Sequence, residues 1–81
     1  MNKPTNGKYD KATDVFWRNV DAVLMERGMT VRELARRLGV DPHTISWKKS
    51  MRINVSIGSA KEMAEAMGTS LDRLVYGNPA S

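Results

Sequence analysis

Residues 30–50 of this chain, TVRELARRLGVDPHTISWKKS, hold the pattern that most limits how it folds, a short helix that stops at a glycine. Thr30 and Glu33 have the spacing of a capping box, in which each side chain bonds a backbone N–H at the start of a helix. Gly39 ends the pattern, because glycine readily adopts the left-handed conformation that terminates a helix. The apolar residues in between share one helix face, at Val31, Leu34, Ala35 and Leu38. The pattern therefore predicts a short amphipathic helix before Gly39.

A second helix is predicted directly after this turn. Asp41 suits its N-cap, and Pro42 suits the first helical position, where the missing N–H of proline costs nothing. Ile45 is the one strongly apolar residue in the first two turns, and the small Ala35 lets it pack closely on the preceding helix. Most other residues of this second helix are polar, which is typical of a helix that reads base edges in the major groove of DNA.

The two helices resemble those of the lambda repressor/Cro-like helix-turn-helix family, often called the XRE type. The resemblance covers residues 16–77, well beyond the two motif helices. It is carried by Leu34-Ala35, Leu38-Gly39-Val40 and Thr44-Ile45-Ser46 in the motif, and downstream by Ile57, Met63-Ala64, Met67-Gly68, Ser70-Leu71-Asp72 and Leu74. It implies an all-α fold, a compact bundle of five short helices with a central helix-turn-helix, and binding to double-stranded DNA.

The composition of the 81-residue chain argues against several classes of protein. A chain of this size makes one small domain, without room for a catalytic cleft between domains. It has no Cys, one His and no recognisable nucleophile–base pair, so we expect no enzyme activity, metal, cofactor or small-molecule ligand. The sequence shows no apolar run of about 18 residues and no signal peptide, which favours the cytoplasm. A net charge of +4 favours a polyanionic partner.

We divide the chain into an N-terminal arm (residues 1–11), a helix-turn-helix domain (12–77) and a tail or linker start (78–81). The arm has no apolar period and is interpreted as flexible. The alternative is an arm that touches DNA phosphate through Lys3, Lys8 or Lys11. The linker-like end fits both a complete small regulator and the N-terminal domain of a larger repressor.

The first helix of the domain is predicted to begin at Thr13 or Asp14 and to end at Arg27, before a glycine. Trp17 lies beside its apolar stripe and is assigned to the core, the usual place for such an aromatic residue. The stripe itself consists of Phe16, Val20, Val23 and Leu24.

Residues 51–57 alternate between apolar and polar, a pattern typical of extended structure. Because the sequence offers no partner strand, we expect an ordered loop whose Ile53 and Val55 cover the core. A fourth helix follows, and the family register favours Ser56 over Ser59 as its N-cap. The inner residues of this helix and of a fifth helix, which runs from Ser70 to about Gly77, are Ile57, Ala60, Met63, Ala64, Met67, Leu71 and Leu74.

The family register turns five residues at the start of the second motif helix toward DNA, namely Pro42, His43, Thr44, Ser46 and Trp47. Imidazole and hydroxyl groups bond base edges, and methyl groups contact the thymine methyl. His43 fits a solvated surface position equally well. Trp47 fits either the DNA surface or the core, and we favour the core because a large aromatic side chain is more often buried.

Phosphate contacts position such a protein on DNA without reading its sequence. The N-terminus of the first motif helix suits an anion, because its N–H groups and its dipole attract negative charge. Relatives often carry Gln where this chain has Val31. The phosphate candidates are Thr30, Val31, Arg32, Arg36, Lys48, Lys49 and Arg52. Arg37 and Arg73 are interpreted as ordinary surface residues.

The resemblance implies a transcription regulator, and we expect a repressor that binds a near-palindromic operator as a homodimer. Val75 and Tyr76 are the candidates for the dimer contact, because this apolar end lies beyond the predicted core. The alternative is a protein-interaction module on the same fold, such as an antitoxin-like partner, without specific DNA readout. Its support is the absence of the family's usual Gln at Val31 and Pro42.

Overall fold

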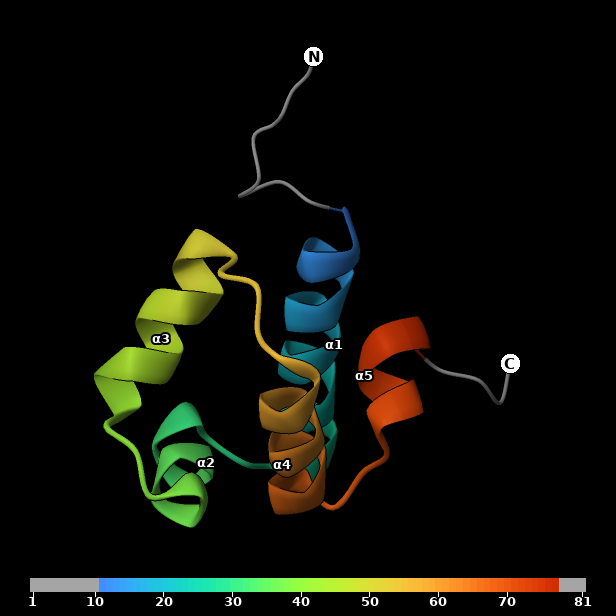
Figure 1. Ribbon diagram of the computed structural model, residues 1–81. Helices are drawn as coiled ribbons and strands as arrows, with labels where there is room; N and C mark the ends of the chain where they lie inside the picture. Colours follow the sequence, from blue (N-terminus) through green and yellow to red (C-terminus); the bar gives the residue numbers. More distant parts are fainter. Residues whose placement is uncertain (1–10, 78–81) are drawn as a thin grey trace.

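The computed structural model describes residues 11–77, which form five α-helices joined by short loops (Figure 1). The helices are α1 (Lys11–Arg27), α2 (Val31–Leu38), α3 (Pro42–Met51), α4 (Ile57–Met67) and α5 (Leu71–Tyr76). No strand occurs in this part of the chain, so the predicted all-α bundle with a central helix-turn-helix is confirmed. None of the described helices has the length and apolar character needed to cross a membrane.

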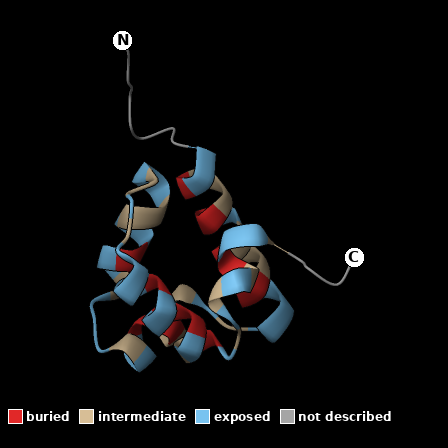
Figure 2. Ribbon diagram, turned by 45° about the vertical axis from the view of Figure 1, so that its right-hand side comes forward, coloured by how far each residue is buried: buried red, intermediate tan, exposed pale blue. Residues whose placement is uncertain are grey.

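The helices surround one core, and α3 lies at its edge. α1 packs on α4 and α5, and α2 packs on α3 and α4. α3 lies at the left margin of the view in Figure 1, far from α5, and its main packing partner is α2. Figure 2 shows buried residues on the sides of the helices that face one another and exposed residues on the outside.

Polar side chains begin four of the helices as the sequence predicts. The side chains of Thr30, Asp41, Ser56 and Ser70 each accept a hydrogen bond from a backbone N–H in the following turn. The choice of Ser56 as the cap of α4 is thereby confirmed. These bonds satisfy donors that have no partner within the helix.

The start of α1 differs from the prediction. The helix is already formed at Lys11, and Thr13 is a buried residue inside it rather than its cap. Thr13 was mistaken for a cap because its hydroxyl suits both positions. Lys11 therefore belongs to α1, while Lys3 and Lys8 of the proposed arm lie outside the described residues.

The core contains the whole predicted stripe of α1, with Leu34 and Ala35 of α2, Ala60, Met63, Ala64 and Met67 of α4, and Trp17, Ile45 and Leu74. The predicted inner residues Val31, Leu38 and Leu71 are partly buried and pack against it. Trp17 is 1% exposed and packs edge-on against Phe16 with ring centroids 5.1 Å apart. Ile57 was predicted inside but is 78% exposed. It shares a face with Ala60, but it is the first residue of α4, at the end where no other element covers it.

Residues 52–56 form the predicted ordered loop. Val55 packs against the core, and Ile53 is half-buried. The backbone carbonyl of Ile53 accepts a hydrogen bond of 2.8 Å from Trp17 Nε1. This bond ties the segment that follows α3 to α1.

Candidate nucleic-acid interface

The outer face of α3 carries polar and aromatic side chains at helical spacing. His43, Ser46, Trp47 and Ser50 are all exposed, and the last three follow His43 at three, four and seven residues. Side chains at this spacing lie on one face of a helix. Of the other base candidates, Thr44 is exposed beside this face and Pro42 is half-buried at the helix start. The structure thus brings three predicted base readers together and adds Ser50, which was not among the predicted base readers.

The position of Trp47 corrects the preference for a core residue, because its side chain is 56% exposed. It lies two residues after Ile45, and a step of two residues turns a side chain to the opposite side of a regular helix. The aromatic side chains of the core in residues 11–77 are those of Phe16 and Trp17, both on α1. Trp47 is therefore available on the solvent side of α3.

The inner face of α3 begins with Ile45, which is 4% exposed. Lys49 and Arg52 follow at four and seven residues, on the same side. Lys49 Nζ lies 2.8 Å from Asp21 Oδ1, and Arg52 Nε lies 2.7 Å from Asp14 Oδ1. Two phosphate candidates are therefore paired with carboxylates of α1. The hydrogen bond from Arg52 lowers the pKa of Asp14 below its ordinary value.

His43 begins the outer face beside a carboxylate. Its side chain is 98% exposed, and its Nδ1 lies 3.3 Å from Asp41 Oδ1. The backbone N–H of His43 donates a 2.8 Å hydrogen bond to the same oxygen. This backbone bond lowers the pKa of Asp41. The capping residue of α3 thus remains an anion that also orients the imidazole ring.

One of the two hydrogen bonds of the predicted capping box at α2 is present. The Thr30 hydroxyl accepts from the Glu33 N–H at 3.0 Å, but the Glu33 carboxylate accepts from two arginines. Arg36 Nη2 lies 2.6 Å and Arg37 Nε 2.9 Å from Glu33 Oε2. Arg36 and then Arg37 lower the pKa of Glu33, and Glu33 raises the pKa of Arg36.

Two arginines that were interpreted as ordinary surface residues hold elements together. Arg37 donates a 3.0 Å hydrogen bond to the carbonyl of Ala66, which joins α2 to α4. Arg73 is 13% exposed in its side chain and lies 2.6 Å from Glu26, which joins α5 to α1. Sequence spacing did not reveal either contact, because the partners are distant along the chain.

Positive charge is concentrated in residues 30–52, which hold six cationic and two acidic residues. The resulting excess of four charges equals the net charge of the whole chain, +4. Within this segment, Arg32 and Lys48 have no ion-pair partner among residues 11–77. Val31 is half-buried and packs against the core. The described residues contain no group of His, Cys, Asp or Glu side chains suited to a metal ion.

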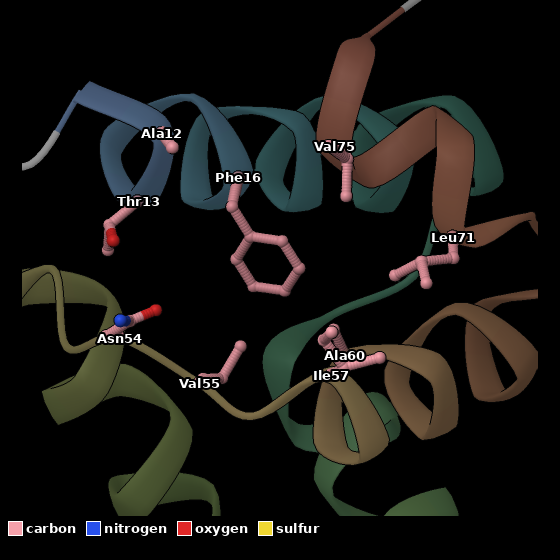
Figure 3. A pocket seen from close by; sticks show the side chains of 9 residues that line it. All are labelled: Ala12, Thr13, Phe16, Asn54, Val55, Ile57, Ala60, Leu71 and Val75. Carbon is pink, nitrogen blue, oxygen red and sulfur yellow. The ribbon is translucent and has the colours of Figure 1, made fainter.

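An apolar groove of about 250 Å³ lies on another side of the bundle, between α1, the 52–56 loop, α4 and α5 (Figure 3). Phe16, Val55 and Leu71 point into it, and Ile57 and Val75 stand along its edge. Val75 is 43% exposed, and the neighbouring Tyr76 is 79% exposed. The two dimer candidates are therefore solvent-accessible apolar residues at or beside a groove.

Comparison with known proteins identifies the family and the fold of the chain. The family model described as "Helix-turn-helix" matches residues 21–74, which include α2, α3, α4 and most of α5. The chain is also similar to the crystal structure of a hypothetical transcription factor, NHTF, from Neisseria, with a TM-score of 0.74 and 24% sequence identity. That similarity covers 99% of this chain and 90% of the other, and it supports the fold. No curated protein matches the chain.

Proposed function

This chain belongs to the XRE-type helix-turn-helix family of DNA-binding transcription regulators, and on that premise we propose that α3 reads a specific sequence in double-stranded DNA. The observation that carries the proposal is the exposed outer face of α3. On the inner face of the helix Ile45 is buried in the core, while on the outer face His43, Ser46 and Trp47 project to solvent. A helix held from one side and free on the other fits the major groove.

Each outer residue offers a different contact. The imidazole of His43 presents a donor and an acceptor to base edges such as guanine O6 and N7. The hydroxyls of Thr44 and Ser46 bond bases or phosphates, and the ring of Trp47 offers an apolar surface to a thymine methyl. Pro42 has no side-chain donor and contributes shape alone. Ser50 extends the same face by one turn.

Phosphate contacts flank this face. Arg32 and Lys48 are the first candidates, because neither is held by a carboxylate of the described residues. Arg36 stays a candidate, since its side chain is 71% exposed despite its pair with Glu33. Thr30 and Val31 place backbone N–H groups at the start of α2. Lys49 and Arg52 stay candidates that reach phosphate after leaving their aspartates.

The regulator acts as a repressor in this proposal, with a dimer that covers a promoter at a near-palindromic operator. The two copies meet through Val75, Tyr76 and the adjoining apolar groove. The groove supports this arrangement because exposed apolar side chains gather there and a second copy would bury them. The two α3 helices of such a dimer lie about 34 Å apart, one turn of DNA.

The same groove favours a second candidate function, binding of another protein by an antitoxin-like module without specific DNA readout. Ile57, Val75 and Tyr76 would then contact the partner. The charge excess in residues 30–52 argues for DNA instead, because none of these cations lines the groove.

Selection of bound duplexes from a random pool tests the proposal. We expect enrichment of a near-palindromic sequence whose half-sites are about one helical turn apart. Trp47 fluorescence should respond to the selected duplex, and Trp17, which is buried, should contribute little to the change. A pool that shows no enrichment, with binding that ignores salt concentration, would favour the protein-interaction module.

A further inference from the structure

Two aspartates on one face of α1 pair with the inner face of α3. Asp21 Oδ1 lies 2.8 Å from Lys49 Nζ, and Asp14 Oδ1 lies 2.7 Å from Arg52 Nε. The aspartates are seven residues apart, so they share one side of the helix. α3 has no buried residue after Ile45. The two pairs therefore join the otherwise lightly packed C-terminal half of α3 to α1.

The backbone of Arg52 shows that the second pair is firmly built into the fold. Arg52 caps α3 with a φ of 54°, a left-handed conformation that favours glycine. Its Nη1 donates a 2.7 Å hydrogen bond to the carbonyl of Lys49, while its Nε contacts Asp14. One guanidinium thus satisfies a carbonyl at the end of α3 and a carboxylate on α1, which a glycine cannot do.

These contacts place carboxylates against two cations that the proposed function assigns to DNA phosphate. The side chains of Lys49 and Arg52 are each 27% exposed, so both cations remain within reach of solvent and of a polyanion. Carboxylate and phosphate oxygens are both strong acceptors for ammonium and guanidinium groups. A phosphate must therefore displace an aspartate before it gains either cation.

We infer that Asp14 and Asp21 are specificity-determining residues that withhold two cations from DNA phosphate and fix the tilt of α3. The inference rests on the proposed function of α3. Non-specific binding comes almost entirely from phosphate contacts, whereas operator binding adds base contacts by the outer face. Withholding two cations lowers the affinity for phosphate by about the same free energy on random DNA and on the operator. A fixed α3 keeps His43 and Trp47 at one angle to the bases, so the preference for the operator depends on the two pairs through the position of α3.

The test compares Asp14→Asn, Asp21→Asn and the double variant with the unaltered protein, on the selected operator and on a random duplex across a salt series. For each freed cation we expect the salt slope on random DNA to steepen by about 1, and affinity at 0.1 M salt to rise roughly three- to eightfold. The ratio of operator to random affinity should fall in each variant, and most in the double variant.

Glu26→Gln is the matched control. It removes the same charge from the same helix, but its partner is Arg73 of α5 and not a residue of α3. The inference is overturned if the aspartate variants change random binding no more than this control does. A second check is Lys49→Gln, which should lower the salt slope more in the Asp21→Asn background than in the unaltered protein. Equal effects of Lys49→Gln in both backgrounds would show that Asp21 does not keep Lys49 from phosphate.

Failure of the inference is distinguishable from failure of the proposed function. An unaltered protein without salt-dependent binding or sequence preference refutes the proposed function itself. An unaltered protein that prefers its operator, with aspartate variants that match the Glu26→Gln control, refutes the inference alone. Thermal melts identify folded variants, and Asp21→Asn alone decides if Asp14→Asn does not fold.

Discussion

Trp17 Nε1 donates a 2.8 Å hydrogen bond to the backbone carbonyl of Ile53, 36 residues further along the chain. The donor lies on α1 in the centre of the core, and the acceptor lies in the loop that follows α3. The bond therefore holds the segment that follows α3 at a fixed position on α1. It also separates the roles of the two tryptophans, since Trp17 supports the fold and Trp47 faces solvent.

Replacement of Trp17 should destabilise the fold. Trp17→Phe removes buried volume and leaves the carbonyl of Ile53 without its donor, and we expect a loss of about 1–3 kcal/mol in the free energy of unfolding. Urea titration measures this loss. Trp47→Phe is the matched control and should change the free energy of unfolding by no more than about 0.5 kcal/mol. Equal midpoints for the two variants would contradict the different burial of the two side chains.

The seam between α2 and α3 has no room for a charge. Ala35 is fully buried where these helices cross. Ala35→Glu places a carboxylate there without a partner, at a cost of several kcal/mol. Because a small domain holds about 5 kcal/mol in total, we expect this variant to be unfolded by circular dichroism. A cooperative melt near the melting temperature of the unaltered protein would show that the seam accommodates a carboxylate.

Caps and stripes were predictable because they depend on residues close in sequence. Thr30 and Asp41 bond backbone groups within their own first turns, so local sequence identifies them, whereas Ser56 was preferred to Ser59 because of the family register. The prediction that Ile57 is buried was wrong because periodicity indicates which face of a helix points inward. It does not indicate whether another element covers the end of that helix. The prediction of Thr13 as a cap was wrong because a threonine hydroxyl suits a cap and a buried helical site equally.

The charged part of the candidate site was less predictable. The cations of Lys49 and Arg52 were identified, but not their partners on α1, 28 and 38 residues away. Such pairs depend on how the helices cross. The spacing of both residues from Ile45 did contain a usable signal, since four and seven residues place them on the inner face. Applied to Trp47, the same rule predicts its exposure.

The ion pair between Asp14 and Arg52 makes stability depend on pH in the acid range. Arg52 lowers the pKa of Asp14 in the folded state below its ordinary value of 3.8. A lowered folded pKa means that the pair stabilises the protein above the ordinary value and loses its effect as pH falls through the lowered one. Asp14→Asn should therefore be less stable than the unaltered protein at pH 6. The gap should narrow as urea midpoints are followed to pH values below 3.8. A gap that stays constant would contradict the pairing.

Association of two copies should depend on Tyr76. Tyr76→Ser removes an apolar side chain that is 79% exposed beside the groove, so the fold should keep its melting temperature. We expect weaker cooperativity on a full operator and less dimer in sedimentation. Met25→Ser is a matched control, because Met25 is an apolar residue of α1 that is 83% exposed and lies outside the groove lining. Full cooperativity in Tyr76→Ser would place the contact between copies elsewhere.

His43 is the residue whose replacement shows whether the outer face of α3 reads bases. The measurement is the affinity for every single-base-pair substitution of the selected operator, taken for the unaltered protein and for His43→Ala. Because the imidazole is exposed, melting should be unchanged. We predict that His43→Ala loses about 1–3 kcal/mol of preference at one base pair in each half-site, with other positions and random DNA unaffected. An unchanged profile in a folded His43→Ala protein would contradict the account.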